Sequence, residues 1–320
     1  MRRQFTLYRY CIIILYILVF SALAVNAQSD YDLTQRWFNE SMYNPAAAGN
    51  SFTTGVFLHG RTQWAGIEGA PLTQTITFDT YAEPINSAFG VVLSRDEIGY
   101  LTSYNIKASY AYYVPLTRKS TISLGLSAGL FNRNRNIEDG MTDQSGDPIL
   151  AYKRENNYSP EFDFGLEYKG PFKLGAAVRH IGFNESSNFP KPAINIWTYI
   201  SSRFNTGRSM SIEPCFSYTY RDKTGRYEAG ALFYFMKTSN FTSYNDKFWL
   251  GAMYRFHGQY AILAGINITP KIRLGYSFDY GTSDLATISK SGTHEIFFAW
   301  QFNRIFYKDE TCPAYRKYNR

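Results

Sequence analysis

The sequence lacks any internal apolar run long enough to form a membrane-spanning helix, although 45% of its 320 residues are hydrophobic. Cysteine and histidine are also scarce, with three and four residues respectively, so a disulfide framework is excluded and no histidine spacing indicates a metal site. No phosphate-binding glycine loop, serine-nucleophile elbow or zinc-protease motif occurs. We therefore expect neither an enzyme nor a bound cofactor or metal.

The one long apolar run lies at the amino terminus. Arg2, Arg3 and Arg9 precede the apolar residues Cys11–Phe20, and the small residues of Ser21–Ala27 follow them. This order is typical of a secretory signal peptide, which we assign to residues 1–27. An uncleaved signal anchor is the alternative, but the run is shorter than the roughly 20 residues that a spanning helix needs.

The remaining charge is modest. Residues 1–27 hold three arginines and no acid, so their removal lowers the formal charge from +7 to +4. The basic residues are scattered along the chain, which argues against binding to nucleic acid. Two cysteines remain after cleavage, Cys215 and Cys312, and their spacing leaves open whether they pair.

Aromatic residues are abundant, with 27 tyrosines and 25 phenylalanines, and they follow a period of two. In Tyr100–Val114 the even-numbered positions are mostly apolar or aromatic and the odd-numbered ones mostly polar. Thr121–Phe131 repeats the pattern after a short turn at Pro115–Lys119. Because neighbouring side chains on a strand point to opposite faces, each segment predicts a strand with one apolar face. Both are long enough to cross a bilayer at a tilt.

The same alternation continues along the chain. It predicts strands at Thr54–Gln63, Leu72–Ala82, Ala88–Ser94, Tyr100–Val114, Thr121–Phe131, Glu161–Tyr168, Phe172–Ile181, Ile194–Phe204, Met210–Tyr220, Tyr227–Met236, Lys247–Arg255, Gln259–Ile268, Lys271–Tyr280 and Thr293–Phe302. We interpret the chain as all-β, a transmembrane antiparallel β-barrel of about 14 strands. A soluble β-sandwich is the alternative, but sandwich strands are shorter and would not all carry outward aromatic residues.

The connections alternate in length. When the connections between strands are counted in order along the chain, most of the even-numbered ones are short. The longest ones are odd-numbered, and they are Asn132–Pro160, Gly182–Ala193 and Gly281–Gly292. Outer-membrane barrels have short periplasmic turns and longer external loops, so we expect both termini in the periplasm. One even-numbered connection, Lys237–Asp246, is longer than this rule predicts.

The polar face would line the lumen. It carries both signs of charge, on Lys107, Glu161, Asp163, Glu167, Lys173, Arg179, Glu213, Glu228, Lys247, Arg255, Lys271, Arg273, Asp279 and Glu295. A strongly selective pore would favour one sign, so the mixture suggests ion pairs across a largely filled interior. Residues 28–50 lack alternation and either plug the lumen or dock to periplasmic machinery.

Four stretches in order resemble the PorP/SprF family of Bacteroidota outer-membrane proteins, part of the type IX secretion system. They are FNESMYNPAAAGN at Phe38–Asn50, RTQW with GAPLTQTIT at Arg61–Thr77, DEIG followed by YAYY and LGLSAG at Asp96–Gly129, and GYSFDY with GTHEI at Gly275–Ile296. The chain departs from the family pattern at Asn39-Glu40-Ser41, where Asn-Pro is usual, and in the polar tail 303–320.

The resemblance implies an integral component of the type IX secretion and gliding-motility apparatus, acting in secretion or surface attachment of cargo through protein–protein contacts. The implied partners are a periplasmic ring lipoprotein, a peptidoglycan-binding protein and the C-terminal domains of cargo. An outer-membrane transport channel, of porin or hydrophobic-substrate type, is the alternative. The chain would divide into the signal peptide 1–27, a periplasmic segment 28–50, the barrel 51–302 and the tail 303–320.

The candidate interaction residues are those that carry the resemblance. They are Phe38, Asn39, Asn44, Pro45, Arg61, Gln63, Trp64, Gly69, Pro71, Thr73, Asp96, Gly99, Tyr276, Asp279, Gly292, His294 and Glu295. His294 and Glu295 are adjacent on a predicted strand, so we expect them to face opposite sides of the wall.

Overall fold

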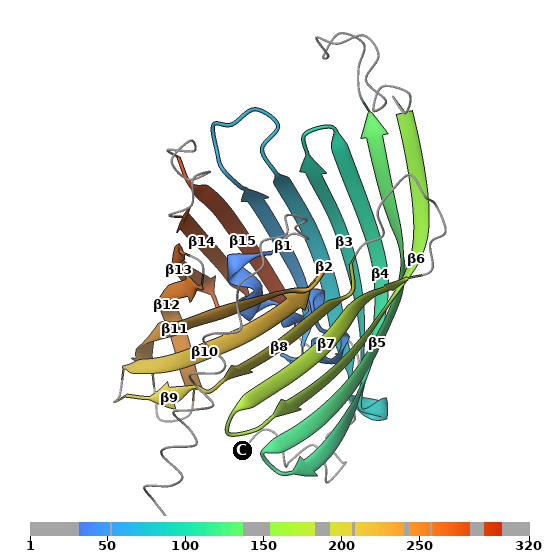
Figure 1. The fold of residues 1–320 in the computed structure, drawn as a ribbon. Coiled ribbons are helices and arrows are strands. Elements are labelled where there is room, and N and C mark those ends of the chain that lie inside the picture. Colours follow the sequence, from blue (N-terminus) through green and yellow to red (C-terminus); the bar gives the residue numbers. More distant parts are fainter. Residues whose placement is uncertain are drawn as a thin grey trace, which may run out of the picture.

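The computed structural model describes residues 32–51, 53–136, 154–182, 193–206, 209–239, 243–256, 258–281 and 291–302. They form a closed antiparallel barrel of 14 strands (Figure 1). The strands are β1 (Thr54–Thr62), β2 (Leu72–Ala82), β3 (Ser87–Ile98), β4 (Leu101–Thr117), β5 (Ser120–Asn136), β6 (Arg154–Lys169), β7 (Lys173–Gly182), β8 (Asn195–Ser201), β10 (Met210–Arg221), β11 (Thr224–Ser239), β12 (Ser243–Arg255), β13 (Gln259–Thr269), β14 (Ile272–Gly281) and β15 (Thr293–Phe302). A two-residue piece, β9 (Phe204–Asn205), pairs with the start of β10.

The barrel closes because its first and last strands pair. β1 lies between β2 and β15, with His59 opposite both Thr75 and Phe297. β10 pairs with both β8 and β11, which completes the circuit on the far side. Closure leaves no open sheet edge along the wall, as a bilayer requires. All fourteen predicted strands are present, and the predicted fold class is confirmed.

The two faces of each strand differ as the sequence predicts. On β4, Tyr104, Ile106 and Tyr110 are exposed on the outside, whereas Asn105 and Lys107 are buried in the lumen. Outward positions on the other strands are likewise mostly large apolar or aromatic residues. This distribution suits a wall with lipid outside and polar groups inside. Among the described residues, none belongs to a helix of the length and apolarity needed to cross a membrane.

Several strands extend further than the sequence indicated, most of all in two places. Asn132–Asn136 and Arg154–Pro160, assigned above to one long loop, form a paired ribbon of β5 and β6. Its residues are Asn- and Arg-rich, so no apolar alternation marked them as strand. β11 and β12 similarly continue to Ser239 and from Ser243, which shortens the connection that seemed too long. A bulge at Lys247 breaks their register and leaves this side chain exposed.

The described amino-terminal residues lie inside the barrel (Figure 1). They form three short 3₁₀ turns, η1 (Thr34–Phe38), η2 (Glu40–Met42) and η3 (Pro45–Ala47). Asn44 caps η3 by accepting a hydrogen bond from the Ala46 amide at 3.0 Å, and Pro45 supplies its first residue. Gly49 then turns the chain toward β1 with a φ of 68°. We call residues 32–51 the plug. A fourth turn, η4 (Glu83–Ile85), connects β2 and β3.

Candidate functional site: the plug and its seat in the lumen

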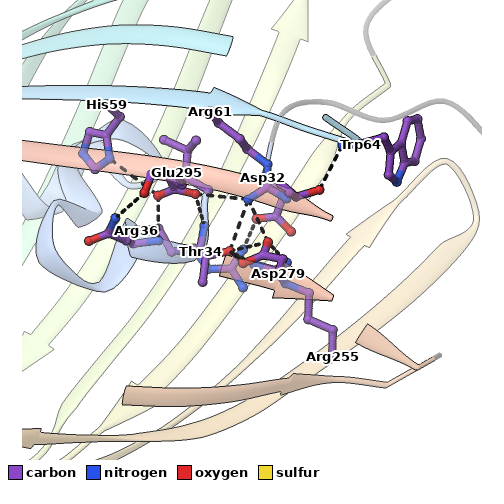
Figure 2. Close-up of polar contacts among 12 residues, drawn as sticks. Asp32, Thr34, Arg36, His59, Arg61, Trp64, Arg255, Asp279 and Glu295 are labelled. Carbon is purple, nitrogen blue, oxygen red and sulfur yellow. Dashed lines mark hydrogen bonds and ion pairs between the residues drawn. The ribbon is translucent and has the colours of Figure 1, made fainter. Parts of the chain in front are cut away.

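Thr34 is the most densely bonded residue of the plug (Figure 2). Its amide donates to Glu295 Oε2 at 2.8 Å, and its hydroxyl donates to the Asp279 carboxylate at 2.7 Å. The same hydroxyl accepts from Arg255 Nη2 at 2.7 Å and from Arg61 Nη1 at 3.2 Å. These four barrel residues surround Thr34, and we call them the clamp.

The clamp joins strands that are far apart in sequence. Arg61 comes from β1, Arg255 from β12, Asp279 from β14 and Glu295 from β15. Arg61 lies 2.9 Å from Asp279 and 3.1 Å from Glu295, and Arg255 lies 2.9 Å from Asp279. The clamp therefore bridges the β1–β15 pairing that closes the barrel.

A second group of polar contacts lies around Arg36, in the same turn of the plug as Thr34. We call this group and the clamp the two anchors. Arg36 donates to Glu228 Oε1 at 2.8 Å and to Ser217 Oγ at 3.0 Å. Trp37 Nε1 also donates to Glu228 Oε1, at 3.1 Å, and the other Glu228 oxygen accepts from Arg255 Nε at 2.7 Å. Glu228 thus connects this anchor to the clamp.

The charges of the two anchors balance. The three guanidiniums of Arg36, Arg61 and Arg255 face the three carboxylates of Glu228, Asp279 and Glu295. None of these six side chains is more than 8% exposed. Removing an ion from water is costly, so such a set is stable only when complete. Loss of one member leaves a buried charge without its partner, which is strongly destabilising.

Aromatic rings pack the middle of the plug against the wall. Trp37 contacts Trp197 and Tyr199 edge-on, with ring centroids 6.4 and 6.1 Å apart. Phe38 lies 5.0 Å from Trp249 and 5.7 Å from Phe297. These contacts add apolar burial to the polar anchors.

Small residues make room for the end of the plug. Gly125 and Gly165 lie opposite one another on β5 and β6, facing η3. A Cβ atom on Gly125 would lie 2.1 Å from the Ala46 amide nitrogen, and one on Gly165 would lie 2.0 Å from Asn44 Oδ1. Ala111 and Ala177 extend the row on β4 and β7. We call this row the seat, and it brings the plug backbone against the wall.

Another charged cluster lies beside the seat. Lys107 Nζ is 2.9 Å from Asp163 and 3.0 Å from Glu161, and Glu161 also contacts His180 Nδ1 at 2.7 Å. His180 has a φ of 60°, next to a register shift between β6 and β7. Its neighbour Arg179 also turns inward and covers the Tyr43 ring at 4.7 Å. The bulge thereby supplies two adjacent lumen-facing side chains.

The plug runs along the length of the lumen. Asp32, at its start, pairs with Arg226, close to the β10–β11 turn. Glu40 pairs with Lys173, the first residue of β7, and Ser51, at the far end, accepts from Gln301 near the end of β15. The described plug therefore contacts both ends of the barrel.

The predicted site residues fall into three groups. The first lies inside the barrel and takes part in the plug contacts. It comprises Phe38, Asn39, Asn44, Pro45, Arg61, Asp279 and Glu295. The structure brings them to one lumen, where Glu295 bonds the plug residue Thr34 across 261 positions of the chain.

The second group lies around the β1–β2 connection. The Gln63 amide donates to the Pro71 carbonyl at 2.9 Å, and the Gly99 amide donates to the Gly69 carbonyl at 2.9 Å. The Thr73 hydroxyl donates to Asp96 Oδ1 at 2.6 Å. Two further members connect this loop to the start of β15. They are Trp64, which bonds Thr293, and Gly292, which bonds Ala65. These contacts order the β1–β2 connection.

The third group faces outward. The Tyr276 hydroxyl lies 2.7 Å from His294 Nδ1 on the outside of the wall, while Glu295, the next residue, is 1% exposed inside it. The expectation that His294 and Glu295 face opposite sides is confirmed.

Four residues of the two anchors were not predicted from the sequence to be site residues. Thr34 and Arg36 lie in the segment without alternation, where no period showed which way a side chain points. Glu228 and Arg255 were recognised as lumen-facing, but nothing in the sequence pairs them with residues 192 and 221 positions away. Cys215 is buried in the lumen, 3.6 Å from Met253 Sδ, and Cys312 lies outside the described residues. Within the described ranges, no group of three or more His, Cys, Asp or Glu side chains forms a metal site.

A closed barrel with an apolar exterior and a polar, plugged interior defines an outer-membrane β-barrel protein. The family described as type IX secretion system membrane protein PorP/SprF matches residues 25–300, and the chain belongs to this family. It is thus a membrane component of the type IX secretion system.

The comparison with solved structures concerns the fold alone. The CymD monoaromatic hydrocarbon channel is 12% identical, with 87% of this chain and 95% of that one aligned at a TM-score of 0.50. The P. putida toluene transporter TodX is 10% identical over 83% of this chain and 94% of that one, with a TM-score of 0.47. A search of curated proteins found no match.

Proposed function

We propose that this protein acts in the type IX apparatus through protein–protein contacts, in secretion or surface attachment of cargo, and not by conducting solutes. The observation that carries the proposal is the plug. Residues 33–49 are buried almost throughout, and their charged members are paired with the wall. A lumen that is filled by a plug bonded to the wall fits a protein that acts as a scaffold better than it fits a diffusion pore.

Two surfaces would make the contacts. The ribbon of β5 and β6 extends past the neighbouring strand β7, whose pairing with β6 ends at Gly182. It would face the cell surface and contact the C-terminal domains of cargo, since protruding connections commonly carry binding residues. The opposite end, with the short turns, would face the periplasmic ring lipoprotein and the peptidoglycan-binding partner. This orientation places the carboxyl-terminal end of β15 on the periplasmic side.

Planar-bilayer recording tests whether the lumen conducts. The full chain should show little steady conductance, and a variant lacking residues 32–50 should show a large one if it inserts. A matched control, the full chain with the exposed Arg118→Ala change, should behave as wild type. A large, steady conductance of the wild-type protein would contradict the proposal and favour a transport channel.

Cargo retention tests the surface contact. Replacing residues 137–153 by a short Gly-Ser turn should lower the amount of cargo C-terminal domain recovered with the barrel from native outer membrane. The control replaces Asp222-Lys223 by Asn-Gly, which preserves the left-handed turn at these two residues. Unchanged recovery after this replacement would rule out residues 137–153 as the cargo site.

A further inference from the structure

Charge is distributed unequally between the two ends of the barrel. At the end with the longer loops, the described charges are of both signs: Arg95 pairs with Glu97 and Arg226 with Asp32, and Asp222 lies next to Lys223. At the opposite end, the rim near β9–β14 carries four basic residues and two nearby acids, Asp246 and Glu213. We call the four basic residues the basic mouth: Arg203, Lys247, Lys271 and Arg273.

The basic mouth is one connected sector of the rim. Arg203 donates to Asp246 at 3.0 Å and lies 3.9 Å above the Tyr234 ring. Asn267 donates to the Asp246 carbonyl at 2.6 Å and lies opposite Arg273 in the β13–β14 register. Lys247 follows Asp246 directly, in the bulge of β12.

Three of the four positive charges have no ion-pair partner among the described residues. Lys247 and Lys271 are exposed, and Arg273 is half-buried. Both nearby acids already have partners: Asp246 is bonded to Arg203, and Glu213 accepts from the Ser201 and Tyr234 hydroxyls. Like charges gathered at one rim repel each other, and a negatively charged partner relieves that repulsion.

We propose that the basic mouth binds an acidic segment of a periplasmic protein of the secretion apparatus. This inference rests on the proposed function and on its orientation. Arg273 occupies a lumen-facing position of β14, in line with the buried Gly275 and Asp279, and Tyr234 also faces inward. Lipid headgroups in the leaflet lie outside the wall, so a lumen-facing Arg273 favours a polypeptide that enters the mouth.

Exposed charges of this kind mainly raise the rate of association with a partner and set the specificity of binding. Dissolved salt screens these electrostatic interactions and weakens them. Binding should therefore fall steeply with ionic strength. The buried Tyr234 ring holds the Arg203 guanidinium in place beside the three other basic side chains.

A peptide titration measures this directly. The purified full-length barrel in detergent should bind a fluorescent oligoglutamate peptide in a salt-dependent manner, and K247E/R273E should weaken binding about tenfold or more. The control R221E/K223E changes one half-buried Arg and one exposed Lys at the other end, and binding should stay within about twofold. Heat-modifiable gel migration confirms that both variants fold. Equal losses in the two variants, or salt-insensitive binding, would overturn the inference.

Photo-crosslinking in cells identifies the occupant. A benzoylphenylalanine at Lys271 should give a protein adduct whose crosslinked peptide is net acidic, and K247E/R273E should abolish it. Adducts to phospholipid or lipopolysaccharide alone would contradict the inference. Cargo retention is measured separately, so the two proposals can fail independently. Normal cargo attachment without the adduct would refute binding at the basic mouth alone. Loss of cargo attachment with the adduct intact would refute the cargo contact alone.

Discussion

The hydroxyl of Thr34 connects three charged side chains of the barrel wall through hydrogen bonds. It accepts from two guanidiniums and donates to a carboxylate while being fully buried. A buried hydrogen bond to a charged group contributes more to stability than one between neutral groups. When one partner is removed, the other stays buried without a hydrogen bond, and its desolvation is then uncompensated. The clamp depends on this hydroxyl although no sequence pattern marks it.

Replacing Thr34 by valine keeps the shape and removes the hydroxyl. We expect T34V to lower the free energy of unfolding by about 1–3 kcal/mol, because Arg61, Arg255 and Asp279 each lose a partner. Urea unfolding of the detergent-solubilised barrel measures the loss. T77V is the matched control, since the buried Thr77 hydroxyl has no hydrogen-bond partner in the described structure, and it should cost little. Similar losses in both variants would refute the role of the Thr34 hydroxyl.

At the scale of elements, the strands were predictable and the plug contacts were not. Alternation in Leu72–Ala82 and Thr293–Phe302 gave the bounds of β2 and β15 as the structure has them. A period of two reports which face a side chain takes, but it cannot say what lies opposite it in the lumen. Arg61, Asp279 and Glu295 entered the candidate site through family motifs. Their convergence on Thr34 depends on barrel closure, which no local pattern encodes.

The seat makes a prediction at the same scale. G125A should displace η3 from the wall, because its Cβ would meet the Ala46 backbone, and overpacking costs about 1–3 kcal/mol. Thermal unfolding should show the loss, and limited proteolysis should cut the plug faster. G60A is the control, since a Cβ on Gly60 meets nothing within 4 Å. Unchanged proteolysis of the plug in G125A would argue against the seat.

The whole molecule has two unlike ends, and labelling can establish which one faces outward. In a C215A/C312A background, a cysteine at Lys223, in the β10–β11 turn, should react with a membrane-impermeant maleimide on intact cells. A cysteine at Arg118, in the β4–β5 turn, should react only after the outer membrane is permeabilised. Both side chains are exposed, so reactivity reports location. The reverse result would invert the proposed orientation.

The position of the clamp has a consequence for how the barrel is assembled. Arg61 stands on the first strand and Glu295 on the last, and both bond Thr34. These bonds form together only when the two strands meet, so capture of the amino-terminal segment and sealing of the wall become one cooperative event. A chain whose plug has not entered would have to close over unpaired charges, which disfavours a sealed but empty barrel as a folding product. The plug thereby acts as a template that couples correct filling to the completion of folding.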